Sequence, residues 1–177
     1  MRRDQFEHVV RAAAVVTGDE LVVIGSQAIH AHSADLPAEL VVSEELDVYP
    51  RSDPERVDLI DAALGQGSQF EEAFGYRAHG VGPETAIAPA GWEDRLVRVE
   101  VASVSGPPAV AWALDIHDLM VSKLVAGREE DYTFATVAIA RGMVDLDELR
   151  RRAALLDTRH REAVAQRIDG CAVRADS

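Results

Sequence analysis

The spacing of apolar residues changes part-way along this chain, and that change limits the fold more than any other feature. Before Pro107-Pro108, the segments 21–24 and 96–101 show the apolar run and the alternation that are typical of strands. After the two prolines the pattern is helical. We therefore expect an α+β fold, with a small mixed β-sheet flanked by helices and a helical C-terminal half. The expected division is 1–110 for the α/β core and 111–177 for the helical part, packed together as one compact domain.

Capping residues predict where the helices begin and end. Acidic or small polar residues satisfy free N–H groups at a helix start, and glycine adopts the left-handed conformation that ends many helices. The expected helix limits are Gly18 as the end of the first helix, Asp115-x-x-Asp118 as the start of a later one that Gly127 interrupts, Asp145-x-x-Glu148 as the start of the next, and Thr158 to Ile168 as the last, ended by Gly170.

The charge balance limits the partners of the protein. With 31 acidic and 18 basic residues, the formal net charge is −13, and such a field repels nucleic acid over most of the surface. Arginines gather at Arg150-Arg151-Arg152 and at Arg159 with Arg161. These clusters indicate either solvated helix faces paired with neighbouring acids or one local basic face.

The chain shows none of the segments that direct or hold a protein in a membrane. The longest apolar run, Leu21 to Ile24, is far short of the roughly 20 residues that span a bilayer. Charged residues follow Met1 where a signal peptide would place its apolar core. Cys171 is the single cysteine, which excludes an intrachain disulfide. We expect a cytoplasmic protein with no membrane partner.

Gly25-Ser26 lies where a buried strand passes into a helix. A glycine at such a junction lets the backbone approach a phosphate, and the N–H groups of the helix start can receive its charge. The same dipeptide is common in ordinary strand-to-helix turns, so by itself it favours a purely structural turn.

Glu45-Leu46-Asp47 forms an acid-x-acid pair within an alternating segment. On a strand, residues i and i+2 face the same way, so the two carboxylates would project from one face while Leu46 and Val48 enter the core. Two carboxylates so close repel each other unless a cation lies between them, which is the arrangement that a hard divalent metal requires. The alternative is an ordinary solvated strand face.

Glu100 is the candidate for a third metal ligand. It alternates with Val99 and Val101 on a later strand, and beside Glu45 and Asp47 it would complete a carboxylate cluster for two-metal phosphoryl chemistry. Alternatively, Arg98 on the same face pairs with Glu100 and leaves no ligand.

Three segments together resemble the nucleotidyltransferase superfamily with its polymerase-beta-like fold. The resemblance covers roughly residues 20 to 150 and points to the AbiEii-like and related uncharacterised (DUF6036-like) families. The matching segments are Ser43-Glu44-Glu45-Leu46-Asp47-Val48, Gly91-Trp92-Glu93-Asp94-Arg95-Leu96-Val97, and Asp118 to Asp131 with its Asp-Leu-x-x-Ser-Lys-Leu-x-Ala-x-Arg-x-x-Asp pattern.

The resemblance implies a nucleotide site and a metal. Gly25, Ser26 and Ser43 would contact the nucleotide, with Ser26 on the triphosphate. Glu45 and Asp47 would hold Mg²⁺, or Mn²⁺ as the alternative, with Glu100 as a further ligand.

The last matching segment would supply the remaining groups. Lys123 would neutralise a nucleotide phosphate with help from Arg128, and Asp131 would orient the lysine or the metal site. Arg128 and Asp131 are also spaced for an i, i+3 salt bridge that needs no ligand.

The chain departs from the family pattern in two places. The first metal acid is usually Asp, whereas Glu45 is one methylene longer, and the stretch from Ser26 to Glu45 is long and contains Pro37. Both departures bear on catalytic competence.

Three functions follow from these observations. The first is metal-dependent transfer of a nucleotidyl group from a nucleoside triphosphate to RNA, a tRNA 3′ end, a protein or a small molecule; relatives in the resembled group include toxins of toxin–antitoxin pairs, which implies an antitoxin protein as a partner. The second is a catalytically degenerate protein of the same fold that binds nucleotide or a partner. The third is a structural interaction protein whose acidic residues are solvated.

Overall fold

The computed structural model describes residues 1–103 and 106–176. Within these residues, five strands form one mixed sheet in the order β3-β2-β1-β5-β4. The strands are β1 (Leu21–Val23), β2 (Glu45–Pro50), β3 (Arg77–Gly80), β4 (Val97–Val101) and β5 (Ala109–Ala113). The predicted α+β class is confirmed.

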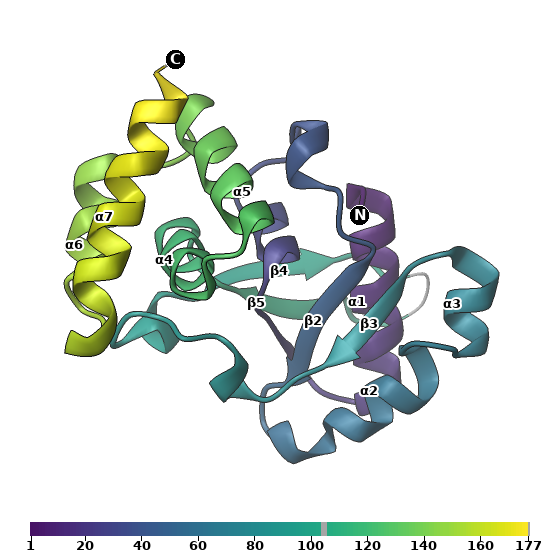
Figure 1. Cartoon of the computed structure of the whole chain (residues 1–177). Coiled ribbons are helices and arrows are strands. Elements are labelled where there is room, and N and C mark those ends of the chain that lie inside the picture. The colour runs from purple at the N-terminus through teal and green to yellow at the C-terminus, as the bar shows by residue number, and fades with distance from the viewer. Residues whose placement is uncertain (104–105, 177) are drawn as a thin grey trace.

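The helices gather in two groups at the two sides of Figure 1. One group contacts the β2–β3 side and the back of the sheet: α1 (Arg3–Thr17), α2 (Val57–Leu64) and α3 (Gln69–Phe74). In the other group, three helices pack around α4 (Ile116–Ala126). They are α5 (Glu129–Ala140), α6 (Leu146–Ala153) and α7 (Thr158–Ala175). None of the helices in the described ranges is long and apolar enough to cross a membrane.

Short 3₁₀ helices occupy several of the connections between these elements. They are η1 (Ser26–Ala31), η2 (Ala38–Leu40), η3 (Pro54–Arg56), η4 (Pro83–Thr85) and η5 (Trp92–Arg95). The predicted helical segment after Gly25 is thus confirmed as the 3₁₀ helix η1.

β1 is the central strand, and its three residues are all buried. It pairs antiparallel with β2 and parallel with β5, so that Val22 lies opposite both Tyr49 and Trp112. β2 pairs parallel with β3, which sets Asp47 directly opposite His79. This register decides which side chains meet at the end of β2.

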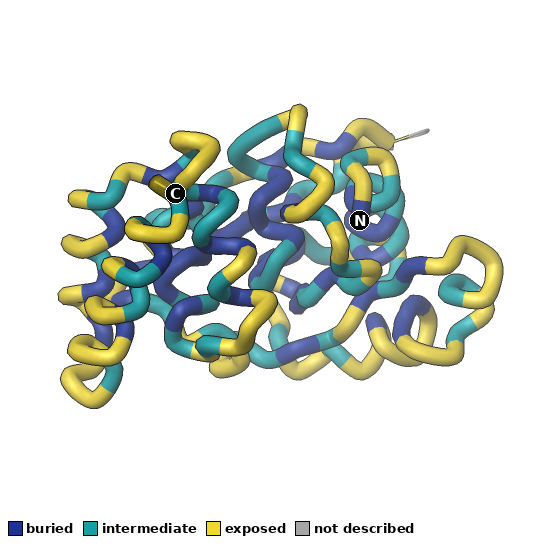
Figure 2. The backbone as a smooth tube through the Cα atoms, turned by 45° about the horizontal axis from the view of Figure 1, so that its top comes forward, coloured by how far each residue is buried: buried dark blue, intermediate teal, exposed yellow. Residues whose placement is uncertain are grey.

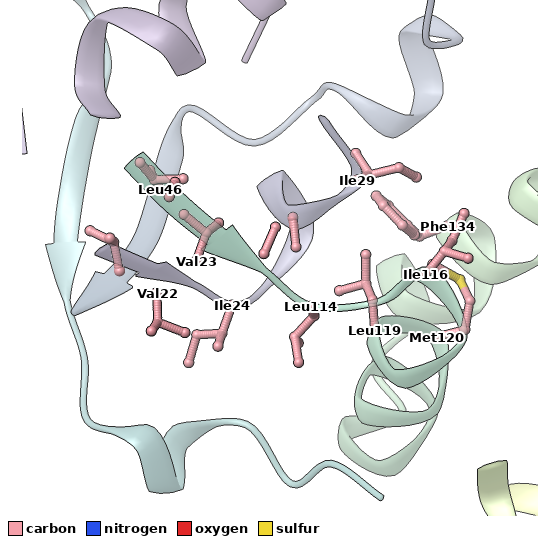
Figure 3. Packing of buried hydrophobic residues seen from close by; sticks show 14 of the residues in the cluster. Val22, Val23, Ile24, Ile29, Leu46, Leu114, Ile116, Leu119, Met120 and Phe134 are labelled. Carbon is pink, nitrogen blue, oxygen red and sulfur yellow. The ribbon is translucent and has the colours of Figure 1, made fainter. Parts of the chain in front are cut away.

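One continuous apolar cluster joins the sheet to the C-terminal helices. Figure 2 shows the buried residues as a connected interior beneath an exposed outer surface. Figure 3 follows the cluster from Val22 and Ile24 at the end of β1 to Leu119 and Met120 of α4. The expected boundary between residues 110 and 111 falls inside β5, which hydrogen-bonds with strands on both sides.

β5 corrects the expectation that only helices follow Pro107-Pro108. Its sequence, Ala-Val-Ala-Trp-Ala, contains three alanines, which have low strand propensity. Ala111 and Ala113 pair with residues of both β1 and β4 and are fully buried. Their small side chains fit where a helix packs closely on the sheet. Tertiary packing therefore overrides local propensity here.

The predicted helix caps are largely confirmed, with one error at the C-terminus. Asp115 and Asp145 accept backbone hydrogen bonds at the starts of α4 and α6, and Gly127 ends α4 in the left-handed conformation. α7, however, continues through Gly170 to Ala175. Cys171 is fully buried and extends the apolar stripe of the helix by another turn, so packing offsets the low helix propensity of glycine.

Candidate functional site

Gly25 brings the backbone against a carboxylate at the end of β1. Its φ of 68° and ψ of −167° lie in a region that only glycine adopts without strain. A Cβ atom at this position would lie 2.2 Å from Oδ2 of Asp47, so any side chain would clash with that carboxylate. Ser26 then begins η1, as a short helical turn next to Asp47.

The two acids of β2 project from one face of the strand. Leu46 and Val48, between and beyond them, are fully buried, whereas the side chains of Glu45 and Asp47 retain 31% and 30% of their exposure. The alternation in the sequence therefore predicts the orientation of both carboxylates correctly.

His79 joins these acids from the neighbouring strand. Its Nδ1 lies 3.1 Å from Oδ1 of Asp47 and 3.3 Å from Oε1 of Glu45. One ligand atom from each of the three residues lies within 4.8 Å of the others, which makes them a candidate metal site among the described residues. Sequence reasoning missed His79, since its position depends on the parallel pairing of β2 with β3, which no local pattern indicates.

Glu45 also has a cationic partner. Arg77 of β3 forms a short ion pair with its carboxylate and a second one with Glu71, at 2.8 Å. Arg77 offsets part of the negative charge that two adjacent carboxylates create, and Nδ1 of His79 lies within hydrogen-bonding distance of both.

Lys123 is held in a buried ion pair. Its Nζ lies 2.9 Å from Oδ1 of Asp131, and the two side chains are only 10% and 5% exposed. The ammonium also lies 4.5 Å from the ring centre of Phe134. Lys123 is thus paired with Asp131, the residue that the resemblance implies as the one to orient it.

Arg128 completes this group at the start of α5. Its backbone N donates to Oδ2 of Asp131 at 3.2 Å, and its guanidinium lies 3.8 Å from the same oxygen. The arginine side chain is 70% exposed, so the i, i+3 pair exists but holds the guanidinium only loosely.

A pocket of about 300 Å³ brings most of the predicted site residues together. Of those residues, it is lined by Gly25, Ser26, Asp47, Lys123, Arg128 and Asp131. These come from the end of β1, from β2 and from the α4–α5 corner, so three distant parts of the sequence meet at one cavity. Glu45 is not among the lining residues.

Ser43 lies at a second cavity rather than at this one. That cavity, of about 580 Å³, shares Ser26 and Lys123 with the first and is otherwise lined by α5 and the segment around η2. The hydroxyl of Ser43 bonds to the backbone of Glu45, with an O···O distance of 3.2 Å to its carbonyl. In this structure Ser43 therefore shapes the start of β2.

Burial raises the pKa of Asp47 above its usual value. The hydrogen bond from His79 and the positive charge of Lys123 act in the opposite direction but do not cancel the effect, and the charge of Glu45 adds to it. A carboxylate in this condition gains from an added cation, because the cation compensates the charge that burial disfavours.

Glu100 does not belong to this site, and the prediction that it joins Glu45 and Asp47 is wrong. β4 is the far edge strand, three strand intervals from β2, which is about 14 Å at the usual spacing. Glu100 is exposed and pairs with Arg98 on its own strand. The alternation of β4 fixed its face correctly but could not show which strand lies next to which.

Two of the matching sequence segments meet in a buried ion cluster. Asp118 is completely buried at the start of α4, and Arg95 of η5 holds it through two bonds, of 2.8 and 3.0 Å. Arg152 of α6 adds a third bond of 3.0 Å. This cluster positions α4, the helix that carries Lys123, and gives both segments a structural reason for their charged residues.

The arginines of α6 are paired rather than free. Arg150 bonds to Asp169, Arg151 to Glu148, and Arg152 to Glu148 and Asp118. These pairs favour the interpretation of a solvated helix face over that of a basic surface for nucleic acid.

Comparison with known proteins gives one match. The model of a family described as "Nucleotidyltransferase of unknown function (DUF6036)" matches residues 5–168, which is most of the chain. No curated protein and no solved structure matches the chain.

Proposed function

The chain belongs to this family of nucleotidyltransferases of unknown function, and from that premise we propose that it moves a nucleotidyl group from a nucleoside triphosphate to an acceptor in a metal-dependent reaction. Within the superfamily, we propose the AbiEii-like group and its polymerase-beta-like arrangement, because the matching segments supply Asp47, Lys123, Arg128 and Asp131 of the pocket.

One observation carries this proposal. The pocket combines a close backbone approach at Gly25-Ser26, a carboxylate at Asp47 and a buried ammonium at Lys123. Backbone N–H groups at a helix start and a cation receive phosphate oxygens, and a carboxylate beside them receives the metal that accompanies a triphosphate. A solvated acidic strand would require neither the glycine nor the lysine.

The donor atoms fit a divalent cation. Glu45, Asp47 and His79 each offer one atom in a cluster small enough for a single ion. Two carboxylates suit Mg²⁺, and the imidazole nitrogen makes Mn²⁺ an equally reasonable occupant. When bound, such an ion would neutralise charge on the phosphates and polarise the reacting oxygen.

Lys123 is positioned to share its charge between the protein and a ligand. Asp131 holds the ammonium at the pocket wall, so the side chain loses little conformational freedom when a phosphate arrives. Arg128, mostly exposed at the pocket rim, can turn inward to a terminal phosphate at small cost.

The acceptor is a hydroxyl-bearing group on RNA, a tRNA end, a protein or a small molecule. The net charge of −13 opposes a long nucleic acid, and three carboxylates, of Glu39, Glu129 and Glu130, line the cavity next to the pocket. A protein or small-molecule acceptor therefore fits the surface better than RNA. A toxin role with an antitoxin partner remains part of the proposal through the resemblance alone.

A second candidate function is supported by a specific observation. Arg77 already pairs with Glu45, and Glu100 is far from the site, so the carboxylate set is smaller than two-metal chemistry requires. This composition favours a catalytically degenerate protein that binds a nucleotide without turnover.

Two measurements separate these functions. Thermal melting with Mg²⁺ or Mn²⁺ and each nucleoside triphosphate tests binding, and incubation with labelled triphosphates and candidate acceptors tests transfer. Binding with transfer supports the enzyme, and binding without transfer to any acceptor supports the degenerate protein. Absence of any metal-dependent shift in melting would refute both.

A further inference from the structure

The pocket has a second wall whose chemistry differs from that of the phosphate-binding groups. This wall comes from the segment Thr85–Ala86–Ile87 and from His160 near the start of α7. Figure 1 shows the segment after β3 crossing beneath α4 toward the beginning of α7. Apolar side chains of Ile24, Leu119, Val125 and Ala126 continue the surface between the two walls.

His160 contributes a buried hydrogen-bonding atom that has no use within the protein. Its Nε2 is buried and has no hydrogen-bond partner among the described residues. Leaving such an atom unpaired is unfavourable, because it has lost its bond to water and gained none in the protein. Among the described residues, Gln27, His30 and Thr136 also contain a buried side-chain atom without a hydrogen-bond partner. None of those three residues lines this pocket, whereas His160 does.

We infer that this wall is the nucleobase subsite and that Nε2 of His160 hydrogen-bonds to the edge of the base. The inference rests on the proposed function, because it requires the phosphates to lie against Gly25 and Lys123. A nucleobase has apolar faces and a polar edge, and this wall places Ala86 and Ile87 beside His160, whose Nε2 has no partner among the described residues.

The neighbouring cavity is a poorer place for the base. Its residues Glu39, Val42, Glu129 and Glu130 are exposed, so water competes for every polar contact there. At His160 the nitrogen is out of reach of water in the free protein, so a turn of the ring toward a bound base would give it the hydrogen bond that it lacks there.

Such a contact selects between bases. A neutral imidazole presents either a donor or an acceptor at Nε2, and a base whose edge offers the wrong group leaves two buried polar atoms unpaired. His160 is therefore a specificity-determining residue, and its removal should reduce discrimination between triphosphates more than it reduces their binding.

The test compares the wild type with His160→Leu and with Glu162→Leu, an exposed change two residues further along the same helix. Leucine resembles imidazole in size. Because Nε2 makes no hydrogen bond within the protein, the substitution breaks none at that atom, and the fold should be kept. Calorimetric titration with ATP, GTP, CTP, UTP and inorganic tripolyphosphate, each with Mg²⁺, measures the affinities.

We expect the wild type and Glu162→Leu to prefer one or two of the four bases by about tenfold, the size of one buried hydrogen bond. His160→Leu should bind all four within about threefold of one another, and tripolyphosphate should bind equally to all three proteins. The ¹⁵N resonance of Nε2, assigned with His160→Gln, should shift with the preferred triphosphate and not with tripolyphosphate.

Each contrary result has a distinct meaning. Undiminished discrimination in His160→Leu, or equal binding of all bases by the wild type, would overturn the nucleobase subsite and leave the proposed function in place. If the wild type binds neither tripolyphosphate nor any nucleotide, the proposed function fails, and the subsite fails with it.

Discussion

The pair of Lys123 and Asp131 shows how a residue can serve both folding and ligand binding. Both charges are buried, so each requires the other, and a phosphate arriving at the pocket would meet a lysine that is already oriented. Removing the lysine alone therefore has two effects, on stability and on binding, which a single variant cannot separate.

Lys123→Met should destabilise the protein by about 3–5 kcal/mol, since it leaves the buried carboxylate of Asp131 with only a loosely held arginine. The double variant Lys123→Met with Asp131→Asn removes both charges and should recover most of that loss. Neither variant should gain stability from triphosphate and metal. Urea unfolding with and without ligand measures both quantities, and ligand stabilisation of the double variant equal to that of the wild type would show that the lysine is purely structural.

Gly25→Ala should destabilise the protein by about 1–3 kcal/mol from backbone strain, with a further loss from the clash with Asp47. Gly75→Ala is the matched control, because Gly75 also has a positive φ but has no atom within 4 Å of the added Cβ. Gly75 has φ 74° and ψ 14°, in the left-handed helical region, so the difference in unfolding free energy between the variants measures the rarer backbone conformation of Gly25 together with its contact with Asp47. Equal losses in the two variants would mean that the close approach at Gly25 is not required.

Asp47→Asn should raise the stability of the ligand-free protein while abolishing its response to metal. The folded-state pKa of Asp47 lies above the unfolded value, chiefly because of burial, so the charged carboxylate opposes folding at neutral pH. The amide removes that charge and also removes a metal ligand. Melting curves at pH 7 with and without Mn²⁺ test the prediction, which a lower melting temperature in the absence of metal would contradict.

At the scale of elements, α4 is fixed by the buried carboxylate of Asp118. Three hydrogen bonds from Arg95 and Arg152 tie η5, α4 and α6 together at this point. A third arginine, Arg167 of α7, donates to the carbonyls of Leu124 and Val125 at the other end of the helix. α4 is thus held at both ends, which keeps Lys123 in position between them.

Asp118→Ala should cost about 3–5 kcal/mol, because it removes the buried carboxylate that two partly buried guanidinium groups share. Asp169→Ala removes an exposed ion pair with Arg150. It should cost less than about 1 kcal/mol, which is usual for surface ion pairs. Chemical denaturation of both variants makes the comparison. Similar losses would indicate that the Asp118 cluster does not anchor the helix.

The elements that sequence reasoning found are those whose signals are local. Alternation oriented Glu45 and Asp47, and capping acids placed the starts of α4 and α6, since these patterns depend on neighbours within a few residues. The same reasoning missed His79 and misplaced Glu100. Both depend on which strands are adjacent, and that is decided by long-range pairing that no short window of sequence contains.

The whole molecule combines a strongly acidic surface with a site that contains its own cations. The net charge of the chain is −13, while Lys123 and Arg128 line the pocket and Arg77 pairs with Glu45 of β2. Such a field admits a metal–triphosphate complex, whose charge is reduced by the ion, more readily than a bare polyanion. The affinity for triphosphate should therefore rise with the concentration of divalent metal more steeply than the direct contacts of the metal with the protein would require.

The stability of the whole molecule should fall between about pH 6.5 and pH 4 because of one buried histidine. His30 is 2% exposed, its Nε2 lies 3.1 Å from the carbonyl oxygen of Met1, and its Nδ1 has no partner among the described residues. Burial, the largest cause, lowers its pKa from 6.5 to about 4. Asp115, whose pKa is lowered to about 2 because hydrogen bonds from His117 more than offset its burial, acts in a separate window below its ordinary pKa.

The direction of this pH dependence follows from how many protons His30 binds in the folded and unfolded states. Between pH 6.5 and 4 the unfolded chain protonates this histidine and the folded chain does not, so the free energy of unfolding decreases as pH falls, by about 3 kcal/mol in total. Protonation in the folded state would create a buried N–H at Nδ1 with no acceptor, which is the physical reason for the shift. His30→Gln keeps a donor for the carbonyl but cannot titrate, so its unfolding free energy should change by about 3 kcal/mol less across the same range. Urea titrations at intervals from pH 7 to pH 4 compare the slopes, which are independent of any constant cost of the substitution. Parallel curves for the two proteins would show that the pKa of His30 is the same in the folded and unfolded states, which would contradict the prediction.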